Sequence, residues 1–453
     1  MDNSIIKLEK GPSSDFSSLL NQIGDAKIVL LGESTHGTHE FYKARAEISK
    51  QLIQQKGFNA IAVEADWPSA YKINKFVKGF IHSTRDARSR LRQGFDGQAG
   101  CADSKESLSD FKRFPTWMWA NKEILELINW MYKYNQKLNL EDRVGFYGLD
   151  LYSLHESAYE VIEYLKTINK VDAQIAKERY ACFDKFGDDP QKYGYFATQQ
   201  ISPSCQKQSV DQAKDLIAKK IEYLKADGFI AKEEFLCAKQ NAFLVKNAEE
   251  YYRLIFTSSS YSDTWNFRDT HMLKTLRSLY EHQKHLKKNA KIIVWAHNSH
   301  VGDARATEFK KFGQINLGQL ARETFGKDSF IVGFTTYKGT VCAASDWGGV
   351  TEKKIVRPAL PNSVEEYFHK LIPGNFVFNL KRDSKDLPQN ILERAIGVIY
   401  LPQTERSSHY FYANVAEQFD AVIHFDETTA VEPLEKISVI EEDELQDTFP
   451  SGF

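Results

Sequence analysis

The amino-acid sequence of 453 residues predicts an α/β fold with a mostly parallel central sheet flanked by helices. Short apolar runs alternate along the chain with long stretches whose apolar residues recur at helical spacing. The short runs are rich in Val, Ile and Phe without polar alternation, which is typical of parallel strands buried on both faces. The predicted strands are residues 27–31, 60–63, 144–147, 291–295, 330–334, 395–400 and 421–425.

The middle of the chain contains no run that resembles a strand. The amphipathic patterns there predict helices over residues 161–170, 211–227, 230–256 and 263–284. We therefore predict that residues 151–285 form a helical insertion subdomain. Residues 1–150 and 286–453 would together form the α/β core domain that carries the active-site strand ends.

Composition excludes several classes of protein. The 59 Lys and Arg residues balance 61 Asp and Glu residues, so no excess positive charge is available for binding nucleic acid. The apolar runs are much shorter than the ~20 residues that cross a bilayer, so no membrane partner is expected. The N-terminal residues lack the basic and apolar segments of a signal peptide, and we expect a cytoplasmic protein.

The five cysteines are scattered, odd in number and without a CxxC pair. This pattern argues against a disulfide framework or a zinc ribbon, and it favours reduced thiols in a cytoplasm. The cysteines are Cys101, Cys182, Cys205, Cys237 and Cys342.

Ionisable side chains follow four of the predicted strands. Because the carboxyl ends of parallel strands meet at one edge of a sheet, we expect these side chains to converge there, where α/β sheets bind ligands. The side chains are Glu33 and His36, Glu64, Asp150, and His297 and His300.

The first of these turns, GESTHG, is the leading candidate for chemistry. We interpret His36 as a base that Glu33 orients; the alternative is a capping loop with an incidental histidine. Thr38 is the predicted N-cap of a helix that ends near Gly57, and Arg45 lies about two turns into that helix. Arg45 is the expected charge partner of Glu64, which follows the next strand.

The residues HNSH follow another predicted strand. Two histidines three positions apart could manage protons or bind a metal, and the plainest alternative is two polar loop residues. The zincin motif HExxH is absent, as are the nucleophile elbow GxSxG, the P-loop and GxGxxG. Nucleotide cofactors therefore have no support, and covalent catalysis is less favoured than water activated by histidine.

Aromatic and charged residues elsewhere are candidates for binding substrate. Arg268 and His271 share one face of a predicted helix, which suggests that they line a pocket, whereas core packing explains most of the aromatics. The predicted substrate-binding residues are Trp67, Trp117, Asp150, Tyr252, Arg268 and His271. The basic cluster Arg85, Arg88, Arg90 and Arg92 is interpreted as a solvated face, and the acidic tail 441–453 is given no function.

The motifs together resemble the erythromycin esterase family, which includes succinoglycan-biosynthesis-like proteins. They occur in order over nearly the whole chain. The matching segments are GESTHGTHEFYKARAEI, AVEADWP, FPTWMWAN, FYGLD, NAEEYYR, WNFRDTHM, WAHNSHVG and ERAIGVIYLPQTERSSHYFYANVAEQFDAVIHFDETTAVEPL.

The resemblance implies an esterase without metal or other cofactor, in which a histidine deprotonates water. It also implies a helical part that roofs a deep cleft, although the stretch 83–111 is longer than the family pattern leads us to expect. In the resemblance His36 matches the base and Glu33 the acid beside it. Arg45, Glu64, His297 and His300 match the other residues that line the family's cleft.

The hypothesis is hydrolysis of an ester or lactone, with a macrolide as one possibility. Arg45 or a protonated His297 or His300 would donate to the oxyanion. The alternatives are a metal-dependent hydrolase that uses the same histidines and carboxylates, an acyl or group transferase, and a binding protein without turnover. The sequence predicts no oligomeric state and no natural substrate.

Overall fold

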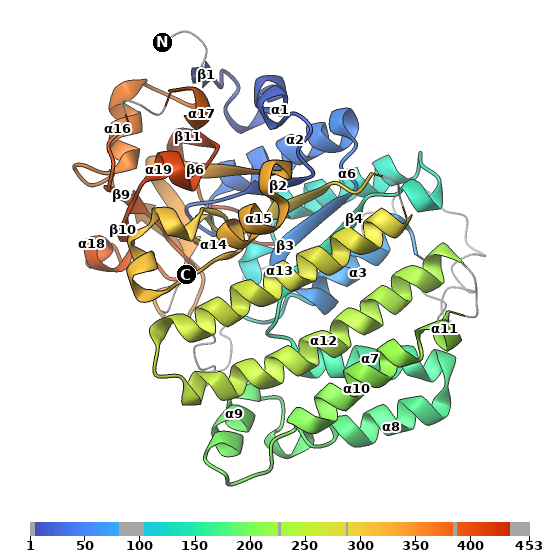
Figure 1. The fold of residues 1–453 in the computed structure, drawn as a ribbon. Coiled ribbons are helices and arrows are strands. Elements are labelled where there is room, and N and C mark those ends of the chain that lie inside the picture. Colours follow the sequence, from blue (N-terminus) through green and yellow to red (C-terminus); the bar gives the residue numbers. More distant parts are fainter. Residues whose placement is uncertain (1–4, 81–103, 225–227, 287–288, 384–386, 435–453) are drawn as a thin grey trace.

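The computed structural model describes residues 5–80, 104–224, 228–286, 289–383 and 387–434 (Figure 1). The arginine cluster between residues 85 and 92, and the acidic tail 441–453, lie outside the described residues.

The centre of the molecule is a large sheet. Within the described residues, nine strands join it in the order β1-β8-β11-β6-β2-β5-β3-β4, with β7 paired to β6. The neighbours from β11 to β4 run parallel, whereas β1, β8 and β7 pair antiparallel. The strands are β1 Ile5–Lys7, β2 Ile28–Leu31, β3 Ala60–Asp66, β4 Gly145–Asp150, β5 Ile292–Trp295, β6 Ser329–Ala343, β7 Glu352–Val356, β8 Phe376–Asn379 and β11 Ala421–Thr428.

Helices cover both faces of this sheet, which confirms the predicted fold class. Alternate residues of β2 show why: Val29 and Leu31 pack into one apolar layer with α1, α2 and α6, and Ile28 and Leu30 into another with α12, α13 and α15. The helices are α1 Ser17–Ile23, α2 His39–Lys56, α3 Trp67–Lys78, α6 Lys122–Asn135, α12 Phe229–Thr257, α13 Tyr261–Leu286, α14 Asn298–Val301, α15 Leu317–Phe325, α16 Val364–Leu371, α17 Leu380–Asp383, α18 Glu405–Ser408 and α19 Val415–Gln418.

One predicted strand, residues 395–400, is wrong. The run is apolar because it is buried across the end of the sheet, where Ile396 and Tyr400 pack against β6 and β7. It forms isolated bridges, Thr35 with Ile396 and Ala344 with Ile399, instead of a ladder. The strand β9 (Ile391–Arg394) precedes it and pairs with β10 (Tyr410–Ala413) in a separate small sheet.

The described residues between β4 and β5 form helices joined by turns and loops, with no strand among them. Figure 1 shows α13 lying along the sheet, with the other helices of the segment beyond it. The additional helices are α7 Leu154–Ile168, α8 Lys170–Tyr180, α9 Pro190–Thr198, α10 Gln206–Ala218 and α11 Lys220–Tyr223. The division of the chain into a core domain and an insertion subdomain stays a prediction. Among the described residues, no helix is both long and apolar enough to cross a membrane.

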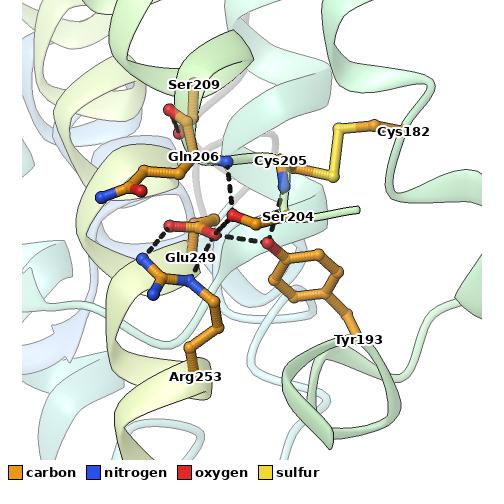
Figure 2. Close-up of a disulfide and its surroundings, with 8 residues drawn as sticks. All are labelled: Cys182, Tyr193, Ser204, Cys205, Gln206, Ser209, Glu249 and Arg253. Atoms are coloured by element: carbon orange, nitrogen blue, oxygen red, sulfur yellow. Dashed lines mark hydrogen bonds and ion pairs between the residues drawn. A yellow bond between two sulfur atoms is a disulfide. The ribbon is translucent and has the colours of Figure 1, made fainter. Parts of the chain in front are cut away.

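Two of the cysteines form a disulfide, so the expectation of reduced thiols is wrong for this pair. Cys182 follows α8 and Cys205 is the N-cap residue of α10, 23 positions later (Figure 2). The two cysteines are brought together by the packing of the helices. Their spacing in the sequence therefore matches no short cysteine motif. Beside the bond, the Tyr193 hydroxyl accepts from the Cys205 N–H at 2.9 Å and donates to Glu249. Cys237 and Cys342 are buried free thiols, and Cys101 lies outside the described residues.

Candidate active site

Four neighbouring strands deliver ionisable side chains to one edge of the sheet, as the sequence predicts. The order β2-β5-β3-β4 places the turns after these parallel strands side by side. Hydrogen bonds connect them: the Asn298 N–H donates to the Glu33 carbonyl oxygen at 2.7 Å, and the His297 N–H donates to Glu64 Oε2 at 2.9 Å.

The GESTHG turn is hydrogen-bonded to and packed against backbone from distant parts of the chain. The Ile396 N–H donates to the Ser34 carbonyl oxygen at 2.8 Å, and the His36 N–H donates to the Ile396 carbonyl oxygen at 3.3 Å. Gly37 lies so close to β6 that an added Cβ would overlap the Cys342 carbonyl oxygen. Thr38 is the N-cap residue of α2 as predicted, although its side chain makes no capping hydrogen bond.

His36 and Glu33 form a buried pair within this turn. His36 Nδ1 donates to Glu33 Oε1 at 3.0 Å, and both side chains are at most 2% exposed. Because Nδ1 carries the proton in this hydrogen bond, the neutral ring has its basic site at Nε2. The Tyr42 hydroxyl donates to the His36 carbonyl oxygen at 2.9 Å and fixes the backbone of the residue.

Arg45 pairs with Glu33, and the predicted pair of Arg45 with Glu64 is wrong. Arg45 Nη2 donates to Glu33 Oε2 at 2.6 Å in a fully buried contact. The guanidinium also lies 4.5 Å from the ring centroid of Tyr42 and 4.7 Å from that of Trp295. The helix α2 starts at the end of the GESTHG turn, and Arg45 on its buried face reaches Glu33 of that turn.

His297 faces His36 as a neutral imidazole. The ring centroids are 4.8 Å apart. Burial is the main reason that the pKa of His297 lies well below its usual value, and the neighbouring His36 lowers it further. Nδ1 of His297 accepts the Ser299 N–H at 3.2 Å, which places the proton of the neutral ring on Nε2. The hypothesis of a protonated His297 is therefore wrong.

Arg268 from α13 pairs with carboxylates from two strands. Its Nε and Nη2 bind the two oxygens of Asp150 at 3.0 and 2.6 Å, and Nη2 also donates to Glu64 Oε1 at 2.8 Å. Burial opposes the charge on Glu64, but the positive His300 and Arg268 outweigh it and hold the pKa of Glu64 well below its usual value. The network thus ties the helical segment to the sheet edge.

His300 is a buried cation in the same network. Its Nδ1 donates to Asp269 at 3.0 Å, and its Nε2 lies 3.3 Å from Glu64 Oε1. Burial lowers the pKa of His300, yet the charges of Asp269 and Glu64 outweigh it and raise the value to about 9. Arg268 Nη1 lies 3.1 Å from His300 Nε2, but both nitrogens then carry protons, so Glu64 is the partner of that nitrogen.

Comparison with known proteins identifies the family and the fold of this chain. A model of the erythromycin esterase family matches residues 53–428. The chain belongs to the erythromycin esterase family. The erythromycin esterase type II of Escherichia coli is 22% identical over 425 residues, which cover 87% of this chain and 93% of that protein. Membership of the erythromycin esterase family supports a hydrolase.

Solved structures show the same fold. A succinoglycan biosynthesis protein has a TM-score of 0.72 and 21% identity over 95% of both chains. An erythromycin esterase mutant in its open conformation has a TM-score of 0.65 and 17% identity over 95% of this chain and 98% of that chain. The resemblance read from the motifs is thus confirmed at the level of family and fold.

In this erythromycin esterase family member, two residues of the network were missed from the sequence. Asp269 holds His300, and Trp265 stacks on the His300 ring at a centroid distance of 4.4 Å. With Arg268 they lie at i, i+3 and i+4 of α13, so they share one face of the helix. That spacing is the signal for them in the sequence, whereas the sequence interpretation pairs Arg268 with His271.

His271 and three predicted aromatic residues pack inside the protein. His271 bonds Asn247 at 2.7 Å and Thr275 at 3.3 Å within the contact between α12 and α13. The Tyr252 hydroxyl donates to the Tyr152 carbonyl oxygen. Trp67 stacks on Tyr71, and Trp117 packs on Phe114. Their role in binding substrate, and the deep cleft, stay predictions.

The candidate ligands of a metal are engaged in other contacts in this family member. Glu33 binds Arg45 and His36, and Glu64 binds Arg268 and His300. In the part of the chain that the structure describes, no group of three or more His, Cys, Asp and Glu side chains is arranged to hold a metal ion.

Proposed function

We propose that this protein hydrolyses a carboxylic ester or lactone of a small molecule with water activated by His36. The buried pair of His36 and Glu33 carries the proposal. A carboxylate that accepts from Nδ1 fixes the tautomer of the ring and leaves Nε2 to take a proton. Arg45 supports the arrangement because its hydrogen bond holds the Glu33 carboxylate in place.

The proposed reaction uses these groups in the following way. His36 Nε2 removes a proton from water while the water oxygen bonds to the carbonyl carbon. Glu33 stabilises the imidazolium, which then gives its proton to the departing alkoxide, so the products are an acid and an alcohol. General-base catalysis of this kind contributes about 10²–10⁴-fold, and no covalent intermediate is required.

The oxyanion of this reaction needs a hydrogen-bond donor, and we assign that role to His297. Its neutral ring bears the proton on Nε2, lies next to His36 and has a hydrogen bond with the Ser34 backbone, which the oxyanion would replace. A neutral imidazole is a suitable donor to a developing oxyanion, and one such donor contributes about 10²–10³-fold. Arg268 and His300 bind the carboxylates around them, so we assign them to holding α13 on the sheet edge.

The test is hydrolysis of a panel that holds a macrolide, simple aryl esters and larger lactones, read by mass spectrometry as the gain of one water. The macrolide is included because the Escherichia coli relative is named an erythromycin esterase. Wild type and His36→Asn are compared with His369→Asn, which changes another His–carboxylate pair, formed with Asp426 at 2.6 Å between α16 and β11.

We expect hydrolysis by wild type and His369→Asn and none by His36→Asn. Turnover of a macrolide would identify the substrate class, whereas turnover of aryl esters alone would keep the chemistry and remove the macrolide. Wild-type rates in His36→Asn would contradict the mechanism. No hydrolysis of any compound by wild type would contradict the proposed reaction.

A further inference from the structure

Asn298 lies between the two histidines of the turn that follows β5, and it is fully buried. Its side chain makes two hydrogen bonds to one residue of β6. Nδ2 donates to the Phe334 carbonyl oxygen at 2.8 Å, and Oδ1 accepts the Phe334 N–H at 3.3 Å. Since its own N–H binds the Glu33 carbonyl oxygen at 2.7 Å, Asn298 joins both histidine-bearing turns to β6.

The sheet order explains why a glycine follows β2. The strand β2 lies between β5 and β6, so the Asn298 side chain must cross the end of β2 to reach Phe334. It crosses at Gly32, where an added Cβ would overlap Asn298 Oδ1. Gly32 is therefore required for the close approach of another side chain.

We propose that Asn298 is a positioning residue, which sets the place of His297 relative to His36 by clamping the turn after β5 to β6. The inference rests on the proposed function. The two histidine rings come from different turns, so their separation depends on how those turns are joined. Displacement of a reacting group by ~1 Å costs about 10²-fold in rate.

The amide of Asn298 suits the contact that it makes. Phe334 presents a carbonyl oxygen and an N–H to the same side chain, so its partner must both donate and accept. Aspartate would place a second acceptor against the carbonyl oxygen, and leucine would leave both buried groups without a hydrogen bond.

The variants Asn298→Ala and Gly32→Ala disturb this contact from opposite sides. The matched control is Gly228→Ala, because a Cβ at Gly228 meets nothing within 4 Å. In folded protein we expect each of the two variants to lower kcat about 10²-fold with little change in KM. The double variant should lose no more than the worse single variant, because both changes act on one contact. If Asn298→Ala fails to fold, Gly32→Ala still tests the contact.

A second readout is independent of turnover. The ring signals of His36 and His297 in ¹⁵N NMR spectra, assigned with His36→Asn and His297→Asn, should shift in Asn298→Ala and Gly32→Ala but not in Gly228→Ala. Folded variants with wild-type kcat and unchanged ring signals would overturn the proposal, as would losses that multiply in the double variant. If wild type hydrolyses no ester, the proposed function fails, and the ring signals still decide the role of Asn298.

Discussion

Replacement of Arg45 by methionine should destabilise the protein strongly. Methionine fills much of the same volume, but it leaves the Glu33 carboxylate buried without its guanidinium partner. Breaking a buried ion pair by removal of one partner costs about 3–5 kcal/mol in the free energy of unfolding. Loss of the contacts between the guanidinium and the rings of Tyr42 and Trp295 adds about 1 kcal/mol.

The assay is urea unfolding of Arg45→Met, Glu33→Gln and the double variant, which together form a double-mutant cycle. We expect the double variant to be more stable than Arg45→Met, because it leaves no uncompensated charge, with a coupling energy of at least ~2 kcal/mol. Arg305→Met is the control: Arg305 binds Asp303 at a similar 2.7 Å, but its side chain is 51% exposed, so its loss should cost below about 1 kcal/mol.

Two results would refute this reasoning. One is a loss of less than ~1 kcal/mol in Arg45→Met, which would mean that Glu33 is not a buried carboxylate that depends on Arg45. The other is independent losses in the cycle, which would mean that Arg45 and Glu33 do not act as a pair.

Three further predictions concern stability. Because folding raises the pKa of His300 from 6.5 to about 9, its contribution is complete below pH 6.5 and is lost as the pH rises through 9. The free energy of unfolding should therefore fall by up to about 3 kcal/mol over this range in wild type, and this component should be absent in His300→Gln. Joint replacement of Cys182 and Cys205 by serine should cost about 3 kcal/mol in urea unfolding, given their 23-residue separation; alkylation of both thiols before reduction would contradict the disulfide. Gly37→Ala should cost at least ~2 kcal/mol, since its Cβ would overlap the Cys342 backbone, and an unchanged unfolding midpoint would show that the turn can move.

Periodicity and strand ends predict most of the fold and the location of the site. Parallel strands at the centre of a sheet are buried on both faces, and this gives β2, β3 and β5 their continuous apolar runs. The run 395–400 gives the same signal, because a buried loop is as apolar as a buried strand. The strands β9 and β7 are not predicted because they lack such an apolar run. β9 contains charged residues, and most residues of β7 are exposed.

Partner choice within the site could not be predicted. Charge alone allows Arg45 to bind either Glu33 or Glu64, and in the structure it binds Glu33. Likewise, Arg268 and His271 share a helix face by spacing, yet His271 bonds Asn247 of α12. These outcomes depend on how helices pack on the sheet, which the local sequence pattern does not contain.

The most direct measurement of the central claim is kcat for Glu33→Gln, His36→Asn and their double variant on an ester that wild type hydrolyses. If Glu33 acts through His36, each single variant should lose about 10³-fold or more, and the double variant should be no slower than His36→Asn. Near-wild-type turnover in His36→Asn, or losses that multiply in the double variant, would contradict a Glu33–His36 unit that activates water.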